Sequence, residues 1–229
     1  DCIMKLASTR DRDTVVSFKD AIFQGLAPDG GLYQLVEYPD LSGVFSRLKE
    51  SPDFIDTAIA MTGELLGDEL SADDVEKLCR TAFPFEPVLT RAEKNISILE
   101  LYHGPSCAFK DFGASFLATS MELFLKNESR RAIILTATSG DTGSAVAQAF
   151  NGKDLIDVVI LYPSGRVSPL QEKQLTAVGG NVHAFEVVGA FDDCQRMVKE
   201  AFLDTELNKI LPLTSANSIN IGRLLPQAF

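Results

Sequence analysis

The sequence has 229 residues, 45% of them hydrophobic and 23% charged, so it can bury a core large enough for one or two domains. Its net charge of -11 argues against nucleic acid and anionic membranes as partners, because both would repel it. The four cysteines form no CxxC pair and there are two histidines, so free thiols are expected rather than a zinc site or a disulfide framework: Cys2, Cys79, Cys107 and Cys194.

The sequence shows neither the pattern of an export signal nor that of a membrane-spanning segment. The amino terminus shows no cationic segment followed by an apolar one, which is the pattern of a secretory leader. No apolar run approaches the ~18 residues that a membrane-spanning helix needs. We therefore predict a cytoplasmic location.

Residues 1–90 are predicted to form a small, mainly helical domain. Short strands are expected at 4–8 and 15–18, followed by a helix over 18–26 and a turn at Ala27–Gly31, where glycine supplies positive φ at no steric cost.

Helical periodicity then dominates from residue 41 to residue 83, with spacings such as Phe54, Ala58, Met61 and Leu65. Ser51-Pro52 and Ser71 are the expected helix starts. The proline-containing stretch after Phe83 breaks this pattern, which puts a domain boundary between residues 84 and 95 and leaves 91–229 as a second domain.

Strands and helices alternate in the second domain. Strands are expected at 96–101, 132–137, 156–162 and 182–188, and helices at 112–126, 142–151, 169–178 and 191–203. The two middle strands are continuous apolar runs, as in parallel strands that are buried on both faces. This pattern predicts an α/β fold with a parallel sheet covered by helices, in which ligands bind at the carboxyl ends of the strands.

Lys110 lies at a strand-to-helix junction of this domain. Phe109, Phe112 and Phe116 could hold its side chain out of bulk water, and desolvation favours the neutral amine. A neutral lysine amine is a nucleophile towards aldehydes. The alternative is an ordinary solvated lysine with no covalent role.

A second motif, Ser139-Gly140-Asp141-Thr142-Gly143, follows the strand at 132–137. The glycines allow the backbone to approach a ligand, while Ser139, Thr142 and the N–H groups of the coming helix could donate to a carboxylate or phosphate. The alternative is a capped helix start with Ser139 or Asp141 as N-cap. The nucleotide-binding patterns GxxxxGK[ST] and GxGxxG do not occur in the sequence.

Two further stretches carry polar side chains next to helix starts. Arg166 and Lys173 could counter a phosphate, although their spacing alone favours a solvated loop and helix face. In the stretch 215–223, Asn217 and Ser218 could simply cap the final helix.

Together these stretches resemble the threonine synthases, which are pyridoxal-phosphate enzymes of the tryptophan synthase β-like group, fold type II. The similarity lies in Glu100–Gly113, which matches the Schiff-base lysine segment, in Ser139–Gly143, and in 18–33, 161–173 and 215–223. It implies pyridoxal 5'-phosphate as cofactor, with Lys110 as the catalytic, cofactor-bearing residue. It also implies substrate binding by Ser139, Gly140, Asp141, Thr142, Gly143, Asn217, Ser218, Asn220 and Arg223.

The resemblance implies a specific reaction, the conversion of O-phospho-L-homoserine and water to L-threonine and phosphate, which is the last step of threonine biosynthesis. The regions of Arg166, Lys173 and Arg223 are then candidates for the leaving phosphate. Threonine synthases continue past the last residue here, with a second glycine-rich loop for the cofactor phosphate and a hydroxyl residue at the pyridine nitrogen. Neither is found in this sequence, so an amino-terminal portion of such an enzyme is expected.

Two alternatives stay open. A sister pyridoxal-phosphate enzyme such as a serine or threonine dehydratase would share Lys110 and the glycine motif, and would release ammonia from threonine. A non-catalytic binding module is the other alternative.

Overall fold

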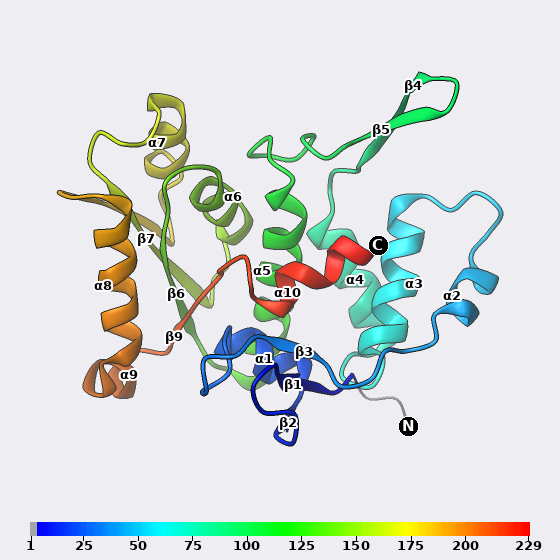
Figure 1. Cartoon of the computed structure of the whole chain (residues 1–229), viewed down its shortest axis with the longest axis horizontal. Helices are drawn as coiled ribbons and strands as arrows, with labels where there is room; N and C mark the ends of the chain where they lie inside the picture. The colour runs from blue at the N-terminus through cyan, green and yellow to red at the C-terminus, as the bar shows by residue number, and fades with distance from the viewer. Residues whose placement is uncertain (1–3) are drawn as a thin grey trace.

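The computed structural model describes residues 4–229 (Figure 1). Cys2 lies outside the described residues, whereas the other three cysteines are free thiols. The amino-terminal part contains a small antiparallel sheet in the order β2-β1-β3 and four helices. Its elements are β1 (Leu6–Ser8), β2 (Val15–Val16), α1 (Phe18–Gln24), β3 (Tyr33–Leu35), α2 (Ser42–Arg47), α3 (Phe54–Leu66) and α4 (Ala72–Ala82).

Helix starts in this part follow local capping chemistry. Ser71 caps α4 as predicted, because its side chain accepts a hydrogen bond from the Asp74 N–H. The predicted start of α3 at Ser51-Pro52 is wrong by two residues. Asp53 is the N-cap, and Asp56 reciprocates in a capping box.

The second part of the chain contains a four-stranded parallel sheet in the order β8-β7-β6-β9. Its elements and helices are α5 (Lys110–Glu128), β6 (Ala132–Ala137), α6 (Asp141–Phe150), β7 (Ile156–Pro163), α7 (Pro169–Thr176), β8 (Val182–Val187), α8 (Phe191–Leu203), α9 (Thr205–Ile210), β9 (Leu213–Thr214), α10 (Ile221–Leu224) and the 3-10 turn η1 (Leu225–Ala228). Figure 1 shows α8 on one side of the sheet and α5 and α6 on the other. The predicted α/β fold with a parallel sheet is confirmed; the two-residue strand β9 was too short to predict.

The strand predicted at 96–101 does not belong to this sheet. It forms β5 (Ile96–Glu100) and pairs antiparallel with β4 (Val88–Glu93), in a hairpin that projects from the body in Figure 1. The strand itself is confirmed, but its predicted place in the parallel sheet is wrong, because an apolar run has the same pattern in a hairpin as in a parallel sheet. Its partner β4 was missed, since Arg91 and Glu93 interrupt its apolar pattern.

One hydrophobic core extends through both parts of the chain. Helix α4 packs on α5, and the ring of Phe83 stacks on Phe116 with centroids 6.0 Å apart. The division into domains at residue 90 therefore stays a prediction.

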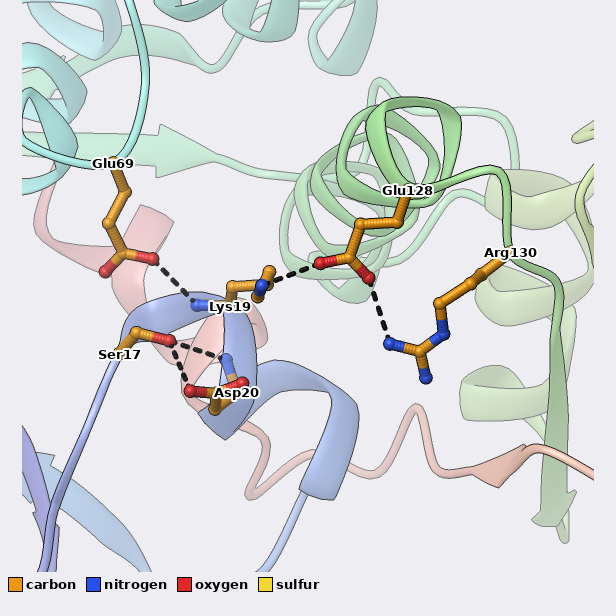
Figure 2. Close-up of polar contacts among 6 residues, drawn as sticks. All are labelled: Ser17, Lys19, Asp20, Glu69, Glu128 and Arg130. Atoms are coloured by element: carbon orange, nitrogen blue, oxygen red, sulfur yellow. Dashed lines mark hydrogen bonds and ion pairs between the residues drawn. The ribbon is translucent and has the colours of Figure 1, made fainter.

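A polar network also holds α1 against α5 (Figure 2). The Glu69 carboxylate accepts hydrogen bonds from the backbone N–H groups of Phe18 (2.7 Å) and Lys19 (3.1 Å), which satisfies the amino end of α1. Lys19 Nζ donates to Glu128 at the end of α5 (2.7 Å), and Arg130 Nη1 donates to the other oxygen of Glu128 (2.9 Å). With its amino end fixed in this way, α1 carries residues 24–30 to the cavity described next.

Candidate active site

A cavity of about 940 Å³ opens at the carboxyl ends of β6 and β9, where the sequence predicts a ligand site. Four walls line it: Gln24–Pro28 with Gly30 from the amino-terminal part, Lys110 with Leu135–Thr142 and Gln171, one face of α8, and Ser215 with Asn217–Ile219. The turn at 27–31, which turn chemistry alone explains, thus also forms part of a cavity wall.

Lys110 is the first residue of α5, and its side chain is 24% exposed. Its Nζ lies 3.7 Å from Asp141 Oδ2 and 4.8 Å from the ring centroid of Phe109. Phe112 and Phe116 do not enclose the amine, contrary to the prediction, because at 100° per residue they point away from Lys110 and pack around Phe83. The amine therefore has a carboxylate neighbour at the cavity wall rather than an apolar sheath.

Thr138 organises the loop that follows β6, and sequence analysis missed it. Its buried Oγ1 accepts hydrogen bonds from Gly140 N (3.1 Å) and Gly143 N (2.9 Å) and lies 3.0 Å from Gly140 O. A Cβ at Gly143 would come within 2.4 Å of the Thr138 methyl group. Gly143 is thus needed for packing against Thr138 and does not line the cavity.

The amino end of α6 presents unpaired N–H groups to the cavity. Gly140 is the N-cap and has no side chain to cap the helix, so the alternative of Ser139 or Asp141 as N-cap is wrong. Among the hydrogen bonds within residues 4–229, none uses the N–H groups of Ser139, Asp141 or Thr142, and all three residues line the cavity. Together with the helix dipole, these groups can bind an anion.

The side chain of Asp141 is bound on both sides. Its Oδ1 accepts from Gln171 Nε2 (2.8 Å) and its Oδ2 faces Lys110. Gln171 lies in the first turn of α7 and forms a capping box with Ser168. The S-x-x-Q spacing could have located the start of α7, but not the contact with Asp141.

The stretch 215–223 divides into lining and supporting residues. Asn217 and Ser218 line the cavity, but the cap predicted for them is made by Asn220, the N-cap of α10. Asn220 is fully buried; its Nδ2 donates to Ile22 O (2.8 Å) and its Oδ1 accepts from Gly222 N. Thus Asn220 ties this stretch to the amino-terminal wall.

Arg223 is also buried and does not line the cavity. Its Nη1 donates to Ala216 O (3.0 Å), and burial lowers the pKa of the guanidinium to about 10. Like Asn220, it supports the cavity wall instead of facing the cavity.

The two cationic side chains that were predicted to counter a phosphate lie outside the cavity. Arg166 and Lys173 are exposed and line no part of the cavity, whereas Lys199 on α8 does. His103 is paired with Glu100 (2.8 Å) outside the lining. Residues 4–229 contain no group of three or more His, Cys, Asp or Glu side chains suited to a metal ion. They also contain no helix long and apolar enough to cross a membrane.

Comparisons with known proteins agree with this geometry. Residues 5–83 match the family described as threonine synthase N terminus, and residues 87–222 match the family of pyridoxal-phosphate dependent enzymes. The chain is 43% identical to the threonine synthase of Escherichia coli K12 over 98% of its own length and 52% of the relative's. It is 39% identical to that of Schizosaccharomyces pombe over 96% and 46%.

Solved structures give the same result. The pyridoxal-phosphate-bound threonine synthase of Brucella melitensis superposes with a TM-score of 0.89 at 42% identity, covering 98% of this chain and 50% of that one. The yeast threonine synthase gives 0.89 at 36% identity, over 99% and 48%. The chain spans about half the length of the curated relatives it matches. With more than half of its residues matching the family, the chain belongs to the pyridoxal-phosphate-dependent enzymes and begins with a threonine synthase amino-terminal domain.

Proposed function

We propose that this chain is part of a threonine synthase, the enzyme that converts O-phospho-L-homoserine and water to L-threonine and phosphate. The observation that carries the proposal is the juxtaposition of the Lys110 amine with the unpaired N–H groups of α6 in one cavity. The amino-terminal wall of that cavity comes from the segment that matches threonine synthases, which favours this activity over that of a dehydratase.

The residues of the cavity fit pyridoxal phosphate. A primary amine on the cavity wall can bond to an aldehyde, and the cavity volume of about 940 Å³ leaves room for a cofactor and a small substrate. When bound, this cofactor supplies an electron sink for negative charge at the substrate's α-carbon. Lys110 is the residue that would hold it.

Lys110 would then act a second time, as the group that moves protons. Once released from the cofactor, its amine can take a proton from the α-carbon and return one, because a neutral amine is a base and its protonated form an acid. The Asp141 carboxylate lies 3.7 Å from this amine.

The substrate carboxylate would bind the N–H groups of Ser139, Asp141 and Thr142 at the amino end of α6. Gly140 has no side chain, and a Cβ there would come within 2.7 Å of Gln171 Nε2. Asn217 and Ser218 offer further hydrogen bonds from the facing wall. We now propose that three residues predicted to bind the substrate instead shape the loops that bind it: Gly143, Asn220 and Arg223.

The substrate phosphate requires a cation at the cavity. Lys199 and Lys110 are the lysines in the lining, and residues 4–229 contribute no arginine to it. We therefore assign Lys199 to the phosphate in place of the regions of Arg166 and Lys173. The cytoplasmic location also stays a proposal.

Covalent trapping tests the assignment of Lys110. The chain is mixed with pyridoxal phosphate, reduced with borohydride, and digested to locate the modified lysine. We expect a pyridoxyl group on Lys110 that is lost in Lys110→Ala and retained in Lys126→Ala, since Lys126 is 56% exposed near the other end of α5. Equal labelling of the exposed lysines and Lys110 would contradict the proposal.

The reaction itself separates the candidate activities. Phosphate release from O-phospho-L-homoserine, with no ammonia release from L-threonine, supports threonine synthase. The reverse pattern supports a dehydratase. Cofactor trapping with neither release supports a binding module.

A further inference from the structure

The Asp141 side chain connects two other helices to its own. Its Oδ1 accepts from Gln171 Nε2 (2.8 Å) and its Oδ2 lies 3.7 Å from Lys110 Nζ. The side chain of Asp141 is 55% exposed, so packing does not fix its rotamer. Its orientation depends on these two polar contacts.

Gln171 is itself fixed at the other end of its amide. Its Oε1 accepts from Ser168 Oγ (3.0 Å) and Ser168 N (3.3 Å), because it completes the capping box of α7. The amide nitrogen must then point the other way, towards Asp141. Gly140 leaves space for it, since a Cβ there would come within 2.7 Å of Gln171 Nε2.

This orientation has an electrostatic consequence for the anion site. A carboxylate that rotated over the unpaired N–H groups of α6 would compete with a ligand anion for them and would repel it. With Asp141 held by Gln171 and paired with Lys110, its negative charge is directed to the amine. The N–H groups of Ser139 and Thr142 stay available to the ligand.

We propose that Gln171 is a positioning residue, which holds the Asp141 carboxylate towards Lys110 and away from the anion-binding N–H groups. The polar chain runs from the Ser168 backbone N–H through Gln171 and Asp141 to Lys110, and so couples the starts of α7, α6 and α5. Its effect on cofactor capture rests on the proposed role of Lys110.

A double-mutant cycle tests whether Gln171 acts through Asp141. We compare the rate at which pyridoxal phosphate is trapped on Lys110 by borohydride in four proteins: the unchanged chain, Gln171→Met, Asp141→Ala and the double variant. We expect Gln171→Met alone to change the trapping rate roughly two- to tenfold, the range of one hydrogen bond. On the Asp141→Ala background the same substitution should change the rate less than about twofold, because its partner is gone. Equal rate changes on both backgrounds would overturn the proposal.

Ser168→Ala separates the positioning role from helix capping. This variant removes the N-cap side chain of α7 but keeps the backbone N–H that donates to Gln171 Oε1. We expect a lower melting temperature with a trapping rate close to that of the unchanged chain. If the trapping rate changes as much as in Gln171→Met, Gln171 acts only as a cap and the proposal is wrong.

A readout without cofactor keeps the test independent of the proposed function. The side-chain amide signal of Gln171 is followed in the NMR spectrum of the cofactor-free, isotope-labelled chain. This signal should shift in Asp141→Ala. The signals of Gln148 and Gln227 should stay in place, because these residues are not bonded to Asp141. If the chain traps no pyridoxal phosphate on Lys110, the proposed function fails while this spectrum still decides the inference. An unchanged Gln171 signal would refute the contact.

Discussion

The hairpin β4–β5 and the sheet strands β6 and β7 use similar apolar side chains, yet they bury them to opposite extents. Ile134 and Ile160 in the sheet are fully buried, whereas Leu89 and Leu99 in the hairpin are 70% and 56% exposed. Strands β6 and β7 have neighbours on both edges and helices on both faces. Within residues 4–229 each hairpin strand pairs only with the other. The burial of these apolar side chains thus depends on the elements that pack against the strand, and not on the residue types alone.

The difference matters because the segment after the hairpin leads directly to Lys110. This segment is fixed not by the hairpin but by Asp111, a carboxylate that is 1% exposed and accepts from Ser106 N (2.9 Å) and Ser106 Oγ (2.5 Å). A side chain at Gly104 would collide with Asp111. The hairpin can therefore be altered with little effect on the site, whereas the buried region cannot.

The largest effect is expected in the buried aromatic cluster. Phe116 on α5 is fully buried and packs on Phe83 and Phe229. Phe116→Ala should lower the free energy of unfolding by about 3–5 kcal/mol, through lost transfer energy and the cavity left behind. Urea unfolding followed by circular dichroism measures it, and a loss below about 1 kcal/mol would mean that the cluster is less tightly packed than described.

A smaller loss is expected at Thr138. Thr138→Val keeps the shape but leaves the N–H groups of Gly140 and Gly143 without their acceptor, at a cost of about 1–3 kcal/mol. Thr138→Ser retains the hydroxyl and serves as the matched control. If Thr138→Val keeps its stability while Thr138→Ser loses it, the methyl group of Thr138 matters and its hydrogen bonds do not.

The ion pair of Glu122 with Lys153 (2.9 Å) should give a pH-dependent effect of up to about 1 kcal/mol. Burial raises the pKa of Glu122, but the hydrogen bonds and charges of Lys153 and Lys126 outweigh it and lower the pKa below its ordinary value of 4.5. A depressed carboxylate pKa stabilises the fold above that value, and this stability is lost as the pH falls below it.

Glu122→Gln should therefore destabilise the chain at neutral pH and have progressively less effect as the pH drops below the ordinary glutamate pKa. Urea midpoints of both proteins over this pH range measure the change. A difference that does not depend on pH would mean that packing, and not charge, is responsible.

The smallest effect is expected in the hairpin. Leu99→Thr replaces an exposed side chain by one that also favours strands, and should change the free energy of unfolding by less than about 0.5 kcal/mol. The same urea experiment applies. A loss comparable with that of Phe116→Ala would show that the hairpin packs against something in solution, and the contrast between the two regions would disappear.

Local patterns determined much of this protein from sequence alone. Continuous apolar runs indicated the two middle parallel strands and apolar periodicity indicated most helices, because each pattern reflects the burial and geometry of its own element. The segments around Lys110 and Ser139–Gly143 were recognisable by their resemblance to threonine synthases, whereas their residue types alone left other interpretations open. Both segments do meet in one cavity.

Only the tertiary structure decided the contacts that join distant segments. The amino-terminal wall at 24–30, the tie from Asn220 to Ile22, and the bond from Gln171 to Asp141 each link residues that are far apart in the chain. The hairpin pairing of β5 belongs to the same class. No local preference specifies such contacts, because a hydrogen bond between distant residues depends on where folding brings both of its partners.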